Sequence, residues 1–243
     1  MKLIRKLLIK VKSIFINNYK YEFDNIKSRN NYYFFEDKLF LKTYEQSNLE
    51  TNFSVPFIPL RVHQAIWCSL LSKNIDGDIV ELGTGKGFIF LNVLNFLDND
   101  LSDKKIYLCD TFLPYKPDPL DGIQKSTGIV SKIYSDSKLN VQNSFNKWNN
   151  VEIVQGYLPD SIDHLLTNVF KISFLHVDLN HHIPEINCLN KLWNYIPIGG
   201  VILLDDFGNP GRELQMQKHL EFFKQKKQNI LSLACGQGLI IKT

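Results

Sequence analysis

The sequence has few cysteines, little net charge and no long hydrophobic run, and each of these shortages excludes a class of protein. Its four cysteines are widely scattered without a Cys-x-x-Cys pair, which argues against a zinc site and predicts buried thiols in a reducing, cytoplasmic compartment. A net charge of +3 is too small to indicate a nucleic-acid partner. No segment is apolar enough over the length needed to span a bilayer. With 243 residues, the chain suits one α/β domain with an extension.

The amino end is basic and lacks acidic residues over its first twenty positions. Apolar residues recur there at helical spacing from Leu3 to Phe15, with lysine and arginine between them. Lys10 and Lys12 interrupt the apolar stretch that a signal peptide needs. Such a helix either contacts an anionic membrane surface peripherally or packs on its own domain or on a sister subunit of a homo-oligomer.

Residues 18–57 are rich in Asn, Tyr, Phe and Lys and show little periodicity, so we expect an irregular segment. Residues 1–57 are therefore expected to form an N-terminal extension, serving as a lid or an oligomerisation element. The main domain is expected to cover residues 58–243.

Strands and helices alternate from Leu60 onward. We expect strands over 78–82, 105–110, 151–154, 172–177 and 201–204, and helices over 61–73, 88–97, much of 128–148, 160–166, 183–195 and 211–226. The proline-rich stretch 112–127 is long enough to be a lid or binding loop. Cys235-Gly236-Gln237-Gly238 predicts a terminal hairpin between 230–234 and 239–242. This pattern predicts an α/β, Rossmann-like, seven-stranded and mostly parallel sheet with a C-terminal antiparallel hairpin strand and an N-terminal helical extension.

The stretch Asp78–Gly87 ends an apolar strand in Glu81 and then in three alternating glycines, Gly83, Gly85 and Gly87. Glycines at these places permit a sharp strand-to-helix turn and let a ligand approach bare backbone. The spacing differs from the Gly-x-Gly-x-x-Gly of nicotinamide dehydrogenases and from a P-loop. Glu-x-Gly-x-Gly-x-Gly at the end of a first strand resembles motif I of class I S-adenosylmethionine (SAM) methyltransferases.

Further polar residues follow the next two predicted strands, where ligands of open α/β sheets bind. Asp110 ends the second strand, where an acid accepts hydrogen bonds from ribose hydroxyls, and Gln155-Gly156-Tyr157 follow the third, near the expected adenine ring. Each could singly be a solvated strand end or a helix cap, but their occurrence in register indicates SAM binding. The expected cofactor-binding residues are Glu81, Gly83, Thr84, Gly85, Gly87, Asp110, Thr111, Gln155, Gly156 and Tyr157.

Acidic residues also end the fourth and fifth predicted strands, namely Asp178 and the pair Asp205-Asp206. Neighbouring strands of a sheet lie roughly 5 Å apart, so these carboxylates could converge. Crowded carboxylates repel unless they are protonated or bound to a cation, and a set of oxygen ligands suits Mg²⁺ or Mn²⁺. Such an ion could bind neighbouring substrate hydroxyls and lower the pKa of the one to be methylated. The alternative is that Asp205 or Asp206 caps the following helix.

Further motifs occur at Phe174–Asn180, Ile198–Gly208, Pro210-Gly211, Asp110–Phe112 and Gly156–Ser161. With these motifs the chain resembles the macrocin O-methyltransferase family over roughly residues 60–225. The resemblance implies methylation of sugar hydroxyls with SAM and Mg²⁺, and metal ligation by Asp178, Asp205 and Asp206. The chain departs from the family at His176, where an acid is common, and at Asn180-His181, where Tyr-Glu is favoured. These departures leave the acceptor and the catalytic base open.

His181 and His182 follow Asp178 at the mouth of the sheet. A histidine titrates near neutral pH, so one of the two is expected to accept the hydroxyl proton, and with Asp178 they are the expected catalytic residues. The alternative is a surface histidine at a helix start. The aromatic run 32–35 either walls a sugar site or packs in the core, and His63 and His164 are expected to serve packing or capping.

Taken together, the sequence predicts an enzyme, a SAM-dependent and divalent-cation-dependent O-methyltransferase. Its expected acceptor is a sugar hydroxyl of a surface polysaccharide, another saccharide or a glycosylated small molecule. One alternative acts on a catechol or another non-sugar diol with the same cofactor and metal; another is an inactive SAM-binding scaffold, which has no need to crowd aspartates. A nucleic-acid methyltransferase is disfavoured because no Asn-Pro-Pro-Tyr-like motif occurs.

Overall fold

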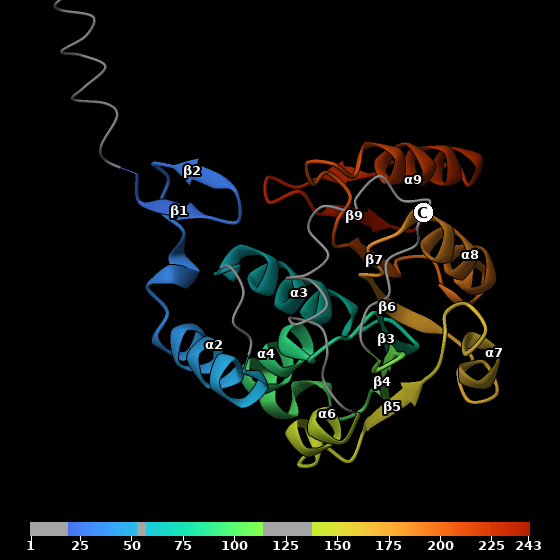
Figure 1. Ribbon diagram of the computed structural model, residues 1–243, viewed down its shortest axis with the longest axis horizontal. Helices are drawn as coiled ribbons and strands as arrows, with labels where there is room; N and C mark the ends of the chain where they lie inside the picture. Colours follow the sequence, from blue (N-terminus) through green and yellow to red (C-terminus); the bar gives the residue numbers. More distant parts are fainter. Residues whose placement is uncertain (1–18, 53–56, 114–137) are drawn as a thin grey trace, which may run out of the picture.

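The computed structural model describes residues 19–52, 57–113 and 138–243. Within these ranges one sheet has seven strands in the order β5-β4-β3-β6-β7-β9-β8 (Figure 1). The strands are β3 (Asp78–Leu82), β4 (Ile106–Asp110), β5 (Val151–Gln155), β6 (Ile172–Val177), β7 (Val201–Leu204), β8 (Leu231–Ser232) and β9 (Gly238–Ile241). Strands β3 to β7 pair in parallel, whereas β9 is antiparallel to both β7 and β8. The predicted fold class is confirmed.

Helices cover both faces of this sheet (Figure 1). One face carries α2 (Lys38–Thr51), α3 (Pro59–Ser72), α4 (Phe88–Leu97) and α6 (Lys138–Phe145); the other carries α7 (Ile162–Leu165), α8 (His182–Leu192) and α9 (Glu213–Gln225). Short 3₁₀ helices are η1 (Tyr33–Phe35), η2 (Asp98–Leu101) and η3 (Trp193–Tyr195). Successive strand residues alternate between the two cores, as Ile79 and Val80 of β3 show.

The order of the strands positions the site. From β3 the chain builds outward to β4 and β5, and then crosses back to β6 on the other side of β3. In such sheets ligands bind beyond the carboxyl ends of the strands at this reversal, between β3 and β6. The acids and glycines selected from the sequence lie at these ends.

Residues 18–57 were predicted to be irregular, and this is wrong for residues 38–51, which form the fourteen-residue helix α2. Its buried stripe is Phe40, Thr43, Tyr44, Ser47 and Thr51, so small polar residues conceal the helical period. The hydroxyls of Thr43 and Thr51 donate to backbone carbonyls of their own helix, which lets them be buried. Asp37 and Asn52 were readable signals, because they cap the two ends.

Ahead of α2 the chain forms a small hairpin, β1 (Tyr21–Phe23) and β2 (Ile26–Ser28), joined by the turn Asp24-Asn25. The predicted basic helix at the amino end and most of the predicted loop 112–127 lie outside the described residues, as does the first part of the predicted helix 128–148. Across the described ranges, no helix combines the length and the apolarity that crossing a bilayer requires.

Candidate active site

A turn of alternating glycines joins β3 to α4. Gly83, Gly85 and Gly87 have positive φ angles of 89°, 54° and 80°. A Cβ on Gly83 would lie 1.8 Å from the carbonyl oxygen of Asp178, so the ends of β3 and β6 approach this closely only because residue 83 has no side chain. The amide of Gly83 donates to the carbonyl of Cys109 at 2.8 Å, which ties the same turn to β4.

Asp110, at the end of β4, holds the glycine turn. Its carboxylate accepts hydrogen bonds from the amides of Gly85 and Phe112, both at 2.8 Å. From the end of β5, the side chain of Gln155 donates to the carbonyl of Thr111 at 3.1 Å. The residues expected around the nucleoside are therefore joined across neighbouring strand ends.

A pocket of about 190 Å³, here named the glycine-turn pocket, opens at these strand ends. Six of the residues expected to bind SAM line it: Gly83, Gly85, Asp110, Thr111, Gly156 and Tyr157. Glu81 and Thr84 line a second pocket of about 270 Å³, here named the acid pocket. Among the described residues that line the two pockets, Gly87 and Gln155 do not occur. The two pockets share Gly83, Asp178 and Asn180, so they are contiguous.

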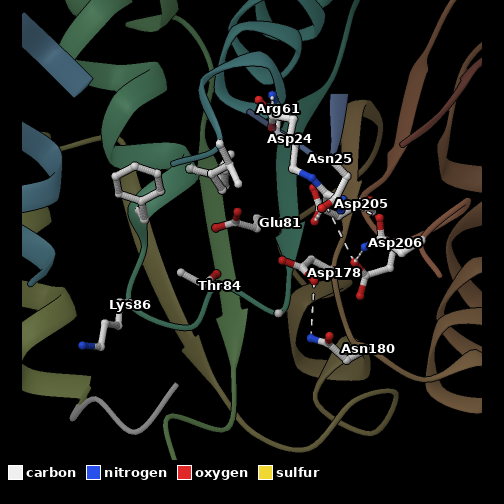
Figure 2. Close-up of a pocket in the computed structure, with 15 residues that line it drawn as sticks. Asp24, Asn25, Arg61, Glu81, Thr84, Lys86, Asp178, Asn180, Asp205 and Asp206 are labelled. Carbon is white, nitrogen blue, oxygen red and sulfur yellow. Dashed lines mark hydrogen bonds and ion pairs between the residues drawn. The ribbon is translucent and has the colours of Figure 1, made fainter. Parts of the chain in front are cut away.

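The acid pocket contains the predicted carboxylate cluster. Asp178, Asp205 and Asp206 each offer an oxygen, and the three oxygens lie within 4.8 Å of one another. Figure 2 shows the carboxylates turned toward each other, with Asn180 beside Asp178. The convergence follows from the parallel pairing of β6 with β7, because the two strands end at the same edge. The geometric part of the sequence prediction is thus correct.

The helix-cap alternative for Asp205 and Asp206 does not hold. Helix α9 begins at Glu213, and its N-cap residue is Arg212. Asp206 instead accepts a hydrogen bond from the side-chain amide of Asn209. The pair therefore serves the pocket and not a helix end.

Burial and mutual repulsion separate the ionisation of the three acids. Burial and the charges of Asp205 and Asp206 raise the pKa of Asp178 well above its ordinary value. Burial and Asp205 likewise raise the pKa of Asp206 to about 6. Burial acts in the same direction on Asp205, but Arg61 and His176 outweigh it and lower its pKa. Asp205 is thus held ionised, whereas an added positive charge would lower the pKa values of Asp178 and Asp206 and favour their ionised forms.

Sequence reasoning missed Arg61, a buried residue on α3 that the fold brings to these acids. Its guanidinium pairs with Asp205 and lies 3.7 Å from an oxygen of Asp206. It also donates to the side chain of Asn209 at 2.7 Å and to the carbonyl of Cys235 at 3.1 Å. Position 61 lies 144 residues from its partner, and the only sequence signal was a charged residue on a buried helical face.

Two further cationic groups contact the cluster. His176 is fully buried, with Nδ1 3.1 Å from Glu81 and Nε2 3.6 Å from Asp205. Burial lowers the pKa of His176, but the negative charges of Asp205 and Glu81 and the hydrogen bond between His176 and Glu81 outweigh burial and raise this pKa to about 10. Arg212 lies 3.7 Å from Asp206 and donates to the side chain of Asn180 at 2.8 Å. The protein itself therefore offsets much of the negative charge, so repulsion alone does not require a metal.

The donor set nevertheless fits a hard divalent cation. It consists of carboxylate oxygens from two neighbouring strands, the ligand type that Mg²⁺ and Mn²⁺ prefer. The outer hydrogen bonds also match a metal site, because ligating carboxylates are normally held by second partners. Gln237 donates to Asp205 at 2.7 Å in this way, and Asn209 to Asp206.

The two histidines expected to supply the base lie next to the pockets. His181 is the N-cap residue of α8, where its Nδ1 accepts from the amide of Ile183 at 3.2 Å, and its ring lies 4.5 Å from that of His182. Neither occurs among the described residues lining the two pockets, whereas Asn180 lines both. Their assignment as the general base stays a prediction.

Three residues of the aromatic run 32–35 pack in the core, whereas Tyr33 is exposed. Phe34 is buried and stacks on the ring of His63 at 4.3 Å, and Tyr32 and Phe35 pack against the same core. Within the described parts of both pocket walls, none of these aromatic residues occurs. Core packing is thus the use that the structure supports for Tyr32, Phe34 and Phe35.

The family model "Macrocin-O-methyltransferase (TylF)" matches residues 60–231. The solved structure of the O-methyltransferase NovP is similar, with a TM-score of 0.62 and 17% identity, covering 76% of this chain and 81% of NovP. Apo CalS11, described as a TDP-rhamnose 3'-O-methyltransferase of calicheamicin biosynthesis, is similar with a TM-score of 0.54 and 17% identity. The match covers 83% of this chain and 93% of CalS11. An O-methyltransferase from Bacillus cereus in complex with SAH has a TM-score of 0.52 and 14% identity, and the match covers 85% of this chain and 92% of that enzyme.

The curated proteins gave no sequence match. The structural similarities, all at low identity, support the fold. The family match spans most of the sheet, the glycine-turn pocket and all three acids, that is, both sites expected from the sequence. The chain therefore belongs to the macrocin O-methyltransferase (TylF) family and is a SAM-dependent O-methyltransferase.

Proposed function

We propose that this enzyme methylates a hydroxyl group of a sugar and uses a divalent cation bound by Asp178, Asp205 and Asp206. The main support is the contiguity of the two pockets, which share Gly83, Asp178 and Asn180. A sulfonium compound in the glycine-turn pocket and a hydroxyl in the acid pocket would meet at these residues. CalS11, which shares the fold, is described as acting on a sugar nucleotide.

In the glycine-turn pocket, Asp110 is the proposed partner of the ribose hydroxyls, and Gly156 and Tyr157 border the adenine. Glu81 is suited to a cationic group of the cofactor, because its Oε2 is buried and has no hydrogen-bond partner in the described part of the chain. Gly83 and Gly85 keep the turn bare, so the cofactor contacts backbone.

Transfer of the methyl group needs little covalent participation by the protein. The acceptor oxygen attacks the sulfonium methyl carbon, the carbon–sulfur bond breaks, and S-adenosylhomocysteine leaves. His181 or His182 is the proposed acceptor of the hydroxyl proton. A bound divalent cation would polarise the acceptor hydroxyl and stabilise negative charge on its oxygen. Holding the two reactants in line supplies much of the acceleration.

The acceptor class is tested by a methyl-transfer screen with SAM and Mg²⁺. We expect transfer to sugars, offered as TDP-rhamnose, UDP-glucose and methyl glycosides, and none to catechol. EDTA should abolish transfer, and Mn²⁺ should restore it. Methylation of catechol alone would contradict the sugar assignment, and full activity in EDTA would remove the metal.

A second expected result concerns the cofactor. Asp110→Asn should weaken SAM binding by about tenfold to a hundredfold, the range expected when a hydrogen bond to a charged group is lost. Isothermal titration calorimetry measures this directly. The matched control is Asp163→Asn, a surface acid paired with Lys191 at 2.7 Å, which should bind SAM as the wild type does. Equal affinity in both variants would contradict the role of Asp110.

A further inference from the structure

The amino end of α3 receives its cap from another part of the chain. Its N-cap residue, Ile58, makes no side-chain hydrogen bond, and Pro59 has no amide hydrogen to satisfy. The next two amides, of Leu60 and Arg61, donate to the carboxylate of Asp24 at 3.0 and 3.4 Å. A carboxylate at a helix amino end is stabilising because it faces the positive end of the helix dipole. Asp24 thereby fastens the β1–β2 hairpin to α3.

The hairpin turn is fixed in a second way. Asp24 and Asn25 have φ angles of 52° and 58°, as a type I′ turn requires, and asparagine and aspartate tolerate this region better than other residues with a side chain. The hydroxyl of Tyr21 donates to Asp24, and the ring of Phe23 packs on that of Phe57 with centroids 4.7 Å apart. The tip therefore has a defined position relative to α3.

This position puts Asn25 on the wall of the acid pocket. Asp24 and Asn25 line the pocket together with Arg61, whose guanidinium pairs with Asp205. Figure 2 shows Asn25 on the side of the pocket nearest Asp205. Asn25 is exposed, and its side-chain amide makes no hydrogen bond to any part of the chain that the structure describes. A rigid turn thus presents an amide with unused hydrogen-bonding capacity beside the acids.

We propose that Asn25 recognises the acceptor through a hydroxyl group other than the one that is methylated. This inference rests on the proposed function and refines its substrate class. A side-chain amide both donates and accepts hydrogen bonds, which matches a hydroxyl group. A catechol has two hydroxyls, both engaged by the reaction and its cation, and so offers none to Asn25. A sugar offers more, and Asn25 selects polyhydroxylated rings.

The test is Asn25→Gly, because Asp-Gly is a favoured type I′ turn and the substitution removes the side-chain amide while keeping the turn. For the sugar accepted in the methyl-transfer screen, KM should rise about tenfold, the value of one hydrogen bond, while kcat and the Kd for SAM stay unchanged. Deoxygenated analogues of that sugar sharpen the test. The analogue that lacks the hydroxyl bound by Asn25 should have a KM with the wild type that is about tenfold above that of the parent sugar. Asn25→Gly should not raise the KM of this analogue further.

Lys27→Ala is the matched control in the same hairpin. Lys27 is exposed, forms a surface ion pair with Glu22 at 3.3 Å and lies outside the wall of the acid pocket, so wild-type kinetics are expected. An unchanged KM in Asn25→Gly would overturn this inference and leave the proposed function intact. A parallel loss of SAM affinity would overturn it too, by showing a structural role. Failure of the wild type to methylate any sugar would overturn the proposed function and this inference together.

Discussion

Asp178→Asn is expected to lower turnover by about a thousandfold, the loss of roughly 4 kcal/mol of transition-state stabilisation, and to lower SAM affinity far less. Asp178 lies where the two pockets meet, and it is one of the three proposed ligands. Among the described residues, the side chain of Asp178 accepts a hydrogen bond only from Asn180, at a long 3.5 Å, so asparagine removes charge without breaking a strong contact. Steady-state kinetics and calorimetry with SAM measure the two quantities.

The same variant should be more stable than the wild type in EDTA. Because burial, Asp205 and Asp206 raise the pKa of Asp178, its ionised form disfavours the folded state. Wild-type stability from this group is therefore lost as pH rises from its ordinary pKa of 3.8 through the raised folded value, and asparagine escapes this loss. Melting temperatures across this pH range show whether the wild type loses stability relative to Asp178→Asn as pH rises. The control is Asp76→Asn, a surface acid. Wild-type turnover of Asp178→Asn, or a melting temperature below that of the wild type at neutral pH, would contradict the proposed role of Asp178.

The parts of the fold that the sequence predicted well are those with a strong local signal. Strands β3, β6 and β7 and helix α4 have the predicted bounds, because each is an apolar run ended by glycine or an acid. The meeting of Asp178 with Asp205 and Asp206 was also predictable, since it follows from the parallel order of strands.

What the sequence did not reveal depends on side chains that meet across long separations. The pairing of Arg61 with Asp205 and the bridge of His176 between Glu81 and Asp205 have no local pattern. The sequence therefore indicated the acids but not the cations that balance them.

Helix α2 was missed for a local reason, because threonine and serine occupy part of its buried face.

Arg61→Met is expected to destabilise the protein by about 3–5 kcal/mol in EDTA, because removal of one partner leaves buried charge uncompensated. For a chain of this size the melting temperature should fall by roughly 6–20 °C. The side chains of Arg61 and Asp205 are only 8% and 10% exposed, so water offers little compensation. The control is Lys171→Met, which breaks a surface pair with Asp76 and should have little effect.

Addition of Mg²⁺ or Mn²⁺ turns this variant into a test of the metal site that does not use activity. If Asp178, Asp205 and Asp206 bind a divalent cation, the ion should replace the missing positive charge and raise the melting temperature of Arg61→Met more than that of the wild type. The double variant Arg61→Met with Asp178→Asn should lose most of this rescue, because one ligand is gone. Equal shifts in all three proteins would mean that the ion binds elsewhere. The acids would then be balanced by arginine and histidine alone, and the hydroxyl would have to be activated without a metal.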